Sequence, residues 1–185
     1  MVEQESTAKF AERARSAQTV VVEAKDLAAV FEYAADLTLQ QGGQSIAAPG
    51  IKGKELAHLS KLCQSKKIEL LTGDLRQKAD MISTGLTGAD WGIAETGTLV
   101  VDSKSEDIRL AGMLCDTHVA FLKKSRIVPD AGTIEKELSR MMKTSHGYTA
   151  FISGASRTAD IERVLTIGVH GPRELHVLIL GEDKQ

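Results

Sequence analysis

Residues 19–50 read TVVVEAKDLAAVFEYAADLTLQQGGQSIAAPG, and this stretch decides the fold. Its first six residues are a short β-branched run, which predicts a strand. Asp26 then stands where a helix N-cap is expected, and a Gly-Gly pair marks the end of that helix. Between them, apolar residues recur at helical spacing, namely Leu27, Val30, Phe31, Ala34 and Leu37. A second buried run at 45–48 completes a strand–helix–strand unit.

The same alternation continues along the chain. Residues 54–65 repeat the helical face with Leu56, Leu59 and Cys63, and residues 68–71 form another strand candidate. A strand–helix–strand–helix–strand order is typical of an α/β sheet with right-handed crossovers. Upstream, 6–16 could form a helix. We therefore expect an N-terminal helical segment over 1–18 and a single α/β domain over 19–185.

The middle of the chain departs from this pattern. Residues 81–101 read MISTGLTGADWGIAETGTLVV, which is rich in glycine and lacks a helical period. Short strands joined by glycine turns are expected there. The remaining expected elements are strands at 82–84, 91–95, 98–101, 118–122, 127–128, 149–152 and 175–180, and helices over 107–114, over 131–142 and from the GASRT stretch to about residue 167.

Composition excludes several classes of protein. The 185 residues are 42% hydrophobic and 26% charged, which is ordinary for a globular protein. A net charge of −2 and an aromatic content of 4% argue against a nucleic-acid partner. No apolar run approaches the ~20 residues that span a bilayer, and the start lacks a signal-peptide layout. A cytoplasmic location is expected.

The chain offers no predicted metal or cofactor site. Cys63 and Cys115 lie far apart, whereas zinc sites and iron–sulfur clusters usually need four ligands clustered in sequence. The two cysteines are interpreted as reduced thiols that act as small hydrophobes. Dinucleotide-binding and Walker fingerprints are absent, and GASRT does not match a serine nucleophile elbow. Redox chemistry would therefore need a partner or a bound cofactor.

The stretch 152–162, ISGASRTADIE, is the first candidate site. It follows a short apolar segment and is predicted to open a helix, whose first amide groups favour an anion. An equally simple alternative is that Ser156 caps the helix and Arg157 faces water. The residues predicted to bind a ligand or anion are Ser153, Gly154, Ser156, Arg157, Thr158 and Asp160 in this stretch, together with Thr96, Gly97 and Gly171 in two further glycine turns.

Two further glycine turns carry candidate chemistry. Glu95 stands in a tight turn with Thr96 and Gly97, where it could act as a base, a nucleophile or a ligand-hydroxyl acceptor, or could hold the turn itself. His170 lies in GVHGP, before Gly171, where glycine permits close backbone approach. Histidine is a common acid–base group in proteins, so His170 is interpreted either as an acid–base candidate or as a structural histidine.

Three motifs in this order resemble the LUD domain family. They are GADWGIAETGTLVVDS at 88–103, ISGASRTADIE at 152–162 and GVHGPRELHVLIL at 168–180. The resemblance runs from about residue 20 to the C-terminus. It implies a three-layer α/β/α fold with a mixed, mostly parallel sheet, similar to the fold of glucosamine-6-phosphate deaminase, ribose-phosphate isomerase and CoA-transferase.

The resemblance also implies a function. Family members act with partner proteins that carry iron–sulfur clusters in the oxidation of L-lactate to pyruvate. This chain would then be a subunit without a cluster, with a small carboxylate or phosphate against the GASRT turn and Glu95 opposite. The alternative is a stand-alone enzyme on a small phosphorylated or acyl-CoA substrate that uses Glu95, assisted by His170. Related folds often form homo-oligomers.

The chain departs from the family pattern at two places. Ala155 stands where the family usually has proline, so the backbone of the GASRT turn is less restricted before a ligand binds. Leu114-Cys115 stands where the family tends to have Leu-Pro, so Cys115 could lie near the site as a reactive thiol.

Overall fold

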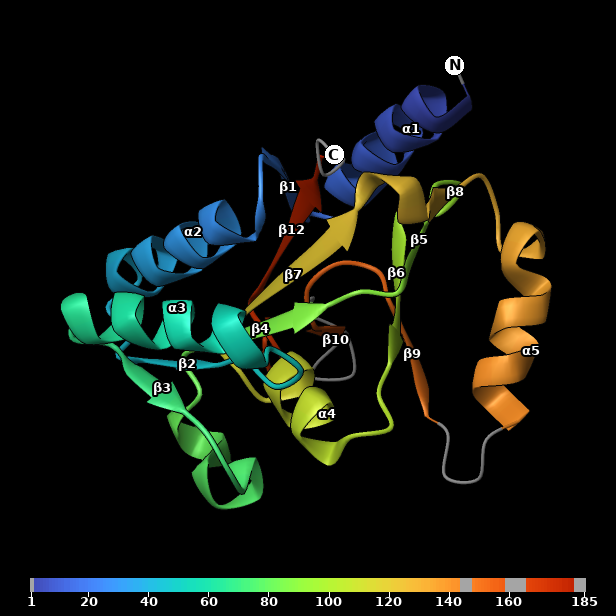
Figure 1. Ribbon diagram of the computed structural model, residues 1–185. Helices are drawn as coiled ribbons and strands as arrows, with labels where there is room; N and C mark the ends of the chain where they lie inside the picture. Colours follow the sequence, from blue (N-terminus) through green and yellow to red (C-terminus); the bar gives the residue numbers. More distant parts are fainter. Residues whose placement is uncertain (1, 144–147, 159–165, 182–185) are drawn as a thin grey trace.

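The computed structural model describes residues 2–143, 148–158 and 166–181, and its centre is a parallel sheet (Figure 1). The sheet has the strand order β1-β12-β7-β4-β2-β3, and each neighbouring pair is parallel. The strands are β1 (Val20–Ala24), β2 (Ser45–Ala47), β3 (Glu69–Leu71), β4 (Thr84–Gly88), β7 (Thr117–Lys123) and β12 (Glu174–Leu180).

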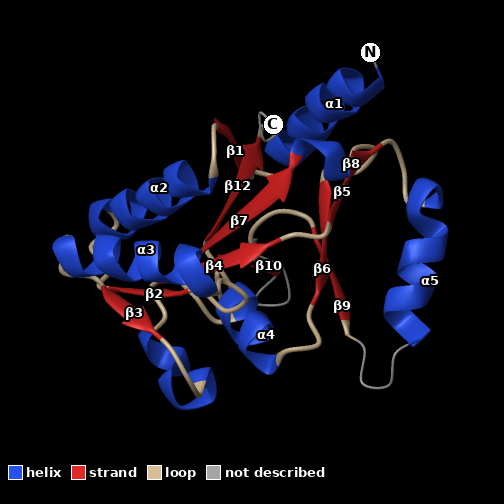
Figure 2. Ribbon diagram, viewed as in Figure 1, coloured by secondary structure: helices blue, strands red, loops and turns tan. Residues whose placement is uncertain are grey.

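Helices α2 (Leu27–Gln40) and α3 (Gly53–Ser65) cover one face of this sheet (Figure 2). The Asp26 carboxylate accepts a hydrogen bond of 2.8 Å from the Ala29 N–H, so it caps α2. The predicted strand–helix–strand unit is confirmed. Side chains from both helices and from five strands form one buried cluster, which includes Phe31, Leu59, Ala24, Ile46, Leu86, Val119 and Leu178.

Helices and a second sheet cover the opposite face. The four-stranded sheet has the order β8-β5-β6-β9, and helix α1 (Val2–Ser16) packs beside its strand β8, whereas helix α4 (Glu106–Met113) packs against β4 and β7. Phe10 of α1 is buried against Leu99 and Val177. The other elements are β5 (Trp91–Ile93), β6 (Thr98–Asp102), β8 (Ile127–Val128), β9 (Thr149–Ile152), α5 (Glu135–Lys143) and the short helices η1 (Leu75–Met81), η2 (Lys124–Arg126) and η3 (Gly132–Ile134).

The predicted fold class is confirmed: helices flank a mostly parallel sheet. The small second sheet occupies part of one flanking layer, and α5 packs on it through Leu138 and Met141. The predicted division of the chain at residue 18 stays a prediction. Among the described helices, none combines the length and apolar character needed to cross a bilayer.

Strand β4 differs from its prediction, which placed a strand at 82–84. It begins at Thr84 and ends at Gly88, and its two glycines are Gly85 and Gly88. At Gly85 an added Cβ would lie 1.7 Å from the Ala111 carbonyl oxygen of α4, and at Gly88 it would meet the Phe121 ring at 3.1 Å. These glycines therefore let a helix and a ring approach the strand closely, instead of marking a turn.

The prediction of a helix from the GASRT stretch to about residue 167 is wrong, because both ends of that segment form strands in the described structure. Strand β10 (Arg157–Thr158) pairs antiparallel with β11 (Thr166–Ile167). The Ser156 N–H also donates to the Pro172 carbonyl at 2.9 Å, and the Ser156 carbonyl accepts from the Gly168 N–H. These long-range bonds override the local helical signal. Residues 159–165, with the predicted ligand residue Asp160, lie outside the described part.

Candidate functional site

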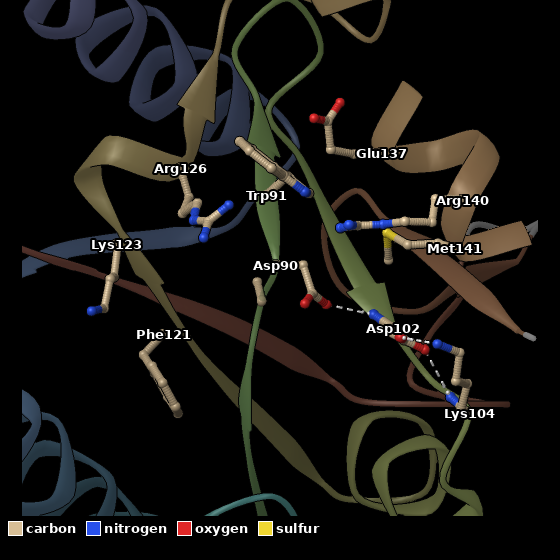
Figure 3. Close-up of a pocket in the computed structure, with 11 residues that line it drawn as sticks. Asp90, Trp91, Asp102, Lys104, Phe121, Lys123, Arg126, Glu137, Arg140 and Met141 are labelled. Carbon is tan, nitrogen blue, oxygen red and sulfur yellow. Dashed lines mark hydrogen bonds and ion pairs between the residues drawn. The ribbon is translucent and has the colours of Figure 1, made fainter. Parts of the chain in front are cut away.

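The carboxyl ends of the parallel strands open into a cavity of about 750 Å³, which we call the charged cavity (Figure 3). The direction in which successive strands are added to the sheet reverses between β2 and β4. Strand β3 lies on one side of β2, whereas β4, β7 and β12 are added in sequence on its other side. Ligands of open α/β sheets bind outside the carboxyl ends at such a point. The lining residues are Ala89, Asp90, Trp91, Asp102, Lys104, Phe121, Lys123, Arg126, Glu137, Arg140 and Met141.

Separate elements deliver these side chains. Asp90 follows β4, Lys123 ends β7, and Arg126 lies in η2 directly after it. Asp102 ends β6 of the second sheet, and Arg140 reaches across from α5 in Figure 3. A neighbouring cavity of about 360 Å³ extends this site toward β2, because it shares Asp90, Asp102, Lys104 and Phe121 with the charged cavity.

Hydrogen bonds and stacking hold the charged groups in place. The Asp90 carboxylate accepts a 2.6 Å bond from the Asp102 N–H, and the Asp102 carboxylate lies 2.8 Å from the Lys104 ammonium. The Arg126 guanidinium lies 4.6 Å from the centroid of the Trp91 ring, in a cation–π contact that orients its planar fork.

Cations outnumber carboxylates in the charged cavity. Its lining contains four cationic side chains, Lys104, Lys123, Arg126 and Arg140, and three carboxylates, Asp90, Asp102 and Glu137. Guanidinium groups bind carboxylates and phosphates through two parallel hydrogen bonds. The arrangement can therefore bind a small anion and present a carboxylate to a hydroxyl on the same ligand.

Several residues predicted from the sequence meet at the other end of the sheet, around a cavity of about 360 Å³ that we call the amino-end cavity. Its lining includes five predicted residues, Ser153, Gly154, Ser156, His170 and Gly171, so the GASRT and GVHGP motifs meet in space. The other lining residues are Gly112, Met113, His118, 148–152, Ala155, Pro172 and Leu175. Arg157 and Thr158 are not part of this lining.

The Glu95 turn is joined to the GASRT turn by hydroxyl groups. Thr96 and Thr98 share a hydrogen bond of 2.7 Å between their hydroxyls, and Thr98 shares another of 2.7 Å with Ser153. The Glu95 side chain is exposed and lines neither the charged cavity nor the amino-end cavity. Its predicted catalytic role stays a prediction.

The end of helix α1 explains two of the glycines predicted to bind a ligand. Gly97 and Gly154 have φ values of +66° and +82°, which favour glycine. An added Cβ would lie 2.3 Å from the Ala14 nitrogen at Gly97 and 2.4 Å from the Ala17 carbonyl at Gly154. Both turns therefore allow α1 to pack closely against them.

Residues of the charged cavity were not singled out from the sequence. Asp90, Trp91 and Asp102 belong to a motif quoted for the family resemblance, and polar residues directly after strands are a signal for this position. Arg126 and Arg140 carry no local signal, because only the tertiary fold brings η2 and α5 to the same cavity.

Both cysteines are expected to be unreactive in the folded protein. Burial raises the pKa of the Cys63 thiol to about 11 and that of Cys115 to about 12. The thiolate is the reactive form, so Ellman's reagent should label neither residue until guanidinium unfolds the chain. Rapid labelling of native Cys115, read by mass spectrometry, would restore the reactive-thiol role considered from the sequence.

His118 should make the fold sensitive to acid. It is 1% exposed, and burial lowers its pKa from 6.5 to about 4. The unfolded chain therefore binds a proton that the native ring resists, and stability falls as pH drops from 6.5 toward about 4. The largest slope from one such group is about 1.4 kcal/mol per pH unit. Urea unfolding at several pH values in this range should show that the free energy of unfolding falls less steeply with decreasing pH in His118→Gln than in the wild-type chain. An equal dependence on pH in both proteins would contradict the low pKa of His118.

Comparisons with known proteins agree with the fold. The LUD domain family matches residues 7–180. Lactate utilization protein C of Halalkalibacterium halodurans is 38% identical over 103 residues, which cover 53% of this chain and 44% of that relative. Lactate utilization protein C of Anoxybacillus flavithermus is 30% identical over 154 residues, covering 77% of this chain and 68% of that protein.

The crystal structure of a DUF162 family protein from Deinococcus radiodurans superposes with a TM-score of 0.65 at 18% identity, over 98% of this chain and 99% of that one. This similarity supports the fold. The match to the relative from H. halodurans spans less than half of that relative's length, whereas the family match covers nearly the whole chain described above. This chain belongs to the LUD domain family.

Proposed function

We propose that this chain takes part in lactate utilization, the process for which its relatives are named. We also propose that a small carboxylate binds in its charged cavity. The observation that carries the proposal is the convergence of four cationic side chains on a cavity at the carboxyl ends of the sheet. The fold favours ligand binding at this edge. The relatives' names supply the pathway.

The lining fits the groups of a 2-hydroxy acid. In this proposal Arg126 and Arg140 bind the carboxylate of L-lactate or pyruvate, and Asp90 or Asp102 accepts a hydrogen bond from the 2-hydroxyl. Oxidation of L-lactate to pyruvate releases two electrons and two protons. Iron–sulfur partner proteins in the cytoplasm would accept the electrons, as the family resemblance implies, so this chain acts as a ligand-binding subunit.

Calorimetry with matched ligands tests the site. L-lactate and pyruvate should bind saturably, and lactamide, which lacks the negative charge, should bind at least about tenfold more weakly, since hydrogen bonds to charged groups contribute about 1.5–3 kcal/mol. Equal affinities for lactate and lactamide would contradict an anion site. Co-purification from cells with proteins that carry iron–sulfur clusters tests the partners separately.

The alternative proposal is a stand-alone enzyme on a small phosphorylated or acyl-CoA substrate. It is supported by the hydroxyl chain that joins the Glu95 turn to Ser153. Turnover by the purified chain that disappears in Glu95→Gln would favour this alternative.

The anion site predicted at the GASRT turn is tested by Arg157→Ala, which should weaken phosphate binding if Arg157 belongs to it.

A further inference from the structure

The charged cavity continues into the neighbouring cavity of about 360 Å³, with which it shares Asp90, Asp102, Lys104 and Phe121. The neighbouring cavity lies where β2 and β4 end, the point at which the direction of strand addition reverses. The charged cavity alone measures about 750 Å³. Pockets of about 300–1,000 Å³ hold drug-sized ligands, so this space fits a molecule much larger than a 2-hydroxy acid.

Charge is distributed unevenly along the two cavities. Three cationic side chains, Lys123, Arg126 and Arg140, line only the charged cavity. Asp90 and Asp102 line both cavities. Among the described residues, those that line only the neighbouring cavity carry no formal charge. A matching ligand has an anionic group at one end, hydrogen-bond donors in the middle and an uncharged group at the other end.

The cationic end suits a phosphate. In the view of Figure 3, Arg126 lies on one side of Asp90 and Lys104 lies on the other. Arg126 is oriented by its contact with Trp91, and Lys123 precedes it by three positions at the end of β7. A phosphate carries more charge and more acceptor oxygens than a carboxylate, so it can bind several cations at once.

The middle of the joined cavities suits the hydroxyls of a sugar. One oxygen of the Asp90 carboxylate accepts the Asp102 N–H, and a carboxylate can accept further bonds through its two oxygens. The contact between Asp102 and Lys104 keeps the second carboxylate charged beside the first. In dinucleotide-binding folds, an acidic residue binds the ribose hydroxyl in the same way.

The uncharged end has the walls of a slot for a ring. Phe121 packs on the backbone at Gly88, where an added Cβ would lie 3.1 Å from its ring. At Gly50 an added Cβ would meet nothing within 4 Å, which leaves the opposite side of the slot open. Ile108 adds apolar surface, and the Ser105 hydroxyl makes no capping bond to α4. Apolar walls with a few hydroxyls match a heterocycle.

We infer that the joined cavities bind a nucleoside monophosphate. Its phosphate contacts Arg126 and its neighbouring cations, its ribose hydroxyls donate to Asp90 and Asp102, and its base lies in the slot beside Phe121. If a small carboxylate also binds at Arg126, as the proposed function holds, the two ligands exclude each other. The nucleotide then regulates access of the carboxylate to this cavity.

Calorimetry with adenosine 5′-monophosphate (AMP) as the probe tests the inference on the full chain. AMP should bind saturably. Adenosine, which lacks the phosphate, and ribose 5-phosphate, which lacks the base, should each bind at least about tenfold more weakly. The 2′,3′-dideoxy form of AMP should bind at least about fivefold more weakly, because it lacks the hydroxyls. No saturable binding of AMP, or equal binding of ribose 5-phosphate, would overturn the inference.

Variants assign the two ends of the ligand. Arg126→Gln should weaken binding of AMP about tenfold and leave the affinity for adenosine unchanged, because only AMP carries the phosphate. Ser105→Trp should fill the slot and abolish binding of both, in a chain that thermal unfolding shows to be folded. Ser60→Trp is the matched control, since Ser60 is also exposed but lines neither cavity. Unaltered AMP binding in Ser105→Trp would contradict the assignment.

Competition separates this inference from the proposed function. AMP at about ten times its own Kd should raise the apparent Kd of L-lactate about tenfold. Binding of L-lactate without binding of AMP would overturn this inference and leave the proposed function intact. Binding of AMP without binding of L-lactate would support this inference and contradict the proposed carboxylate site. Independent binding of both ligands would overturn the shared contact at Arg126.

Discussion

Arg126→Gln is expected to weaken binding of L-lactate and pyruvate by about tenfold to a hundredfold. Arg126 offers a planar fork that is held against Trp91, so little freedom is lost when it binds a carboxylate. Removing a charged partner of this kind costs about 1.5–3 kcal/mol, which corresponds to that loss of affinity. Calorimetry on folded wild-type and variant proteins measures the difference.

Lys124→Gln is the matched control for this variant. Lys124 lies in the same short helix and loses the same charge, but it does not line the charged cavity. Its substitution should change the affinity by less than about twofold, since exposed charges act weakly through solvent. Equal losses in both variants would show that general electrostatic attraction, and not a defined contact with Arg126, holds the ligand.

Gly85→Ala is expected to lower the free energy of unfolding by about 3 kcal/mol, the upper end of the usual cost of overpacking. The added methyl would lie 1.7 Å from the backbone carbonyl of Ala111 and 3.1 Å from the Cys115 sulfur. The Ala111 carbonyl is part of the backbone and cannot rotate away, so β4 and α4 would have to separate. For a chain of this size, Tm should fall by roughly 6–12 °C.

Gly181→Ala serves as its control, because a Cβ there would meet nothing within 4 Å. Urea unfolding should show a change of less than about 0.5 kcal/mol for this surface position. Comparable stabilities of the two variants would mean that α4 does not pack on β4 as described.

The sequence predicts the parallel layer well, because its signals are local. The cap at Asp26 and the apolar spacing through Leu37 belong to one helix, and their physical basis needs no distant partner. The helix prediction after Ser156 is wrong because the structure there depends on distant partners. Bonds from Ser156 to Pro172 and Gly168 connect segments far apart in sequence, and no periodicity encodes them.

The candidate site could be predicted only in part for the same reason. The glycine motifs drew attention to Ser153, Ser156 and His170, and the structure does bring these residues to one cavity. Two glycines in those motifs, Gly97 and Gly154, are explained by the packing of helix α1. The charged cavity combines side chains from two sheets and α5, so its composition emerges only from the fold.

Trp91 allows the binding of a carboxylate in the charged cavity to be observed directly. It is the one tryptophan in the sequence, and it lines this cavity under the Arg126 guanidinium. During titration with L-lactate, its single indole N–H signal in proton–nitrogen NMR spectra should shift saturably, with no such shift from lactamide or in Arg126→Gln. Calorimetrically saturable lactate binding that leaves the Trp91 signal unmoved would contradict the proposed site.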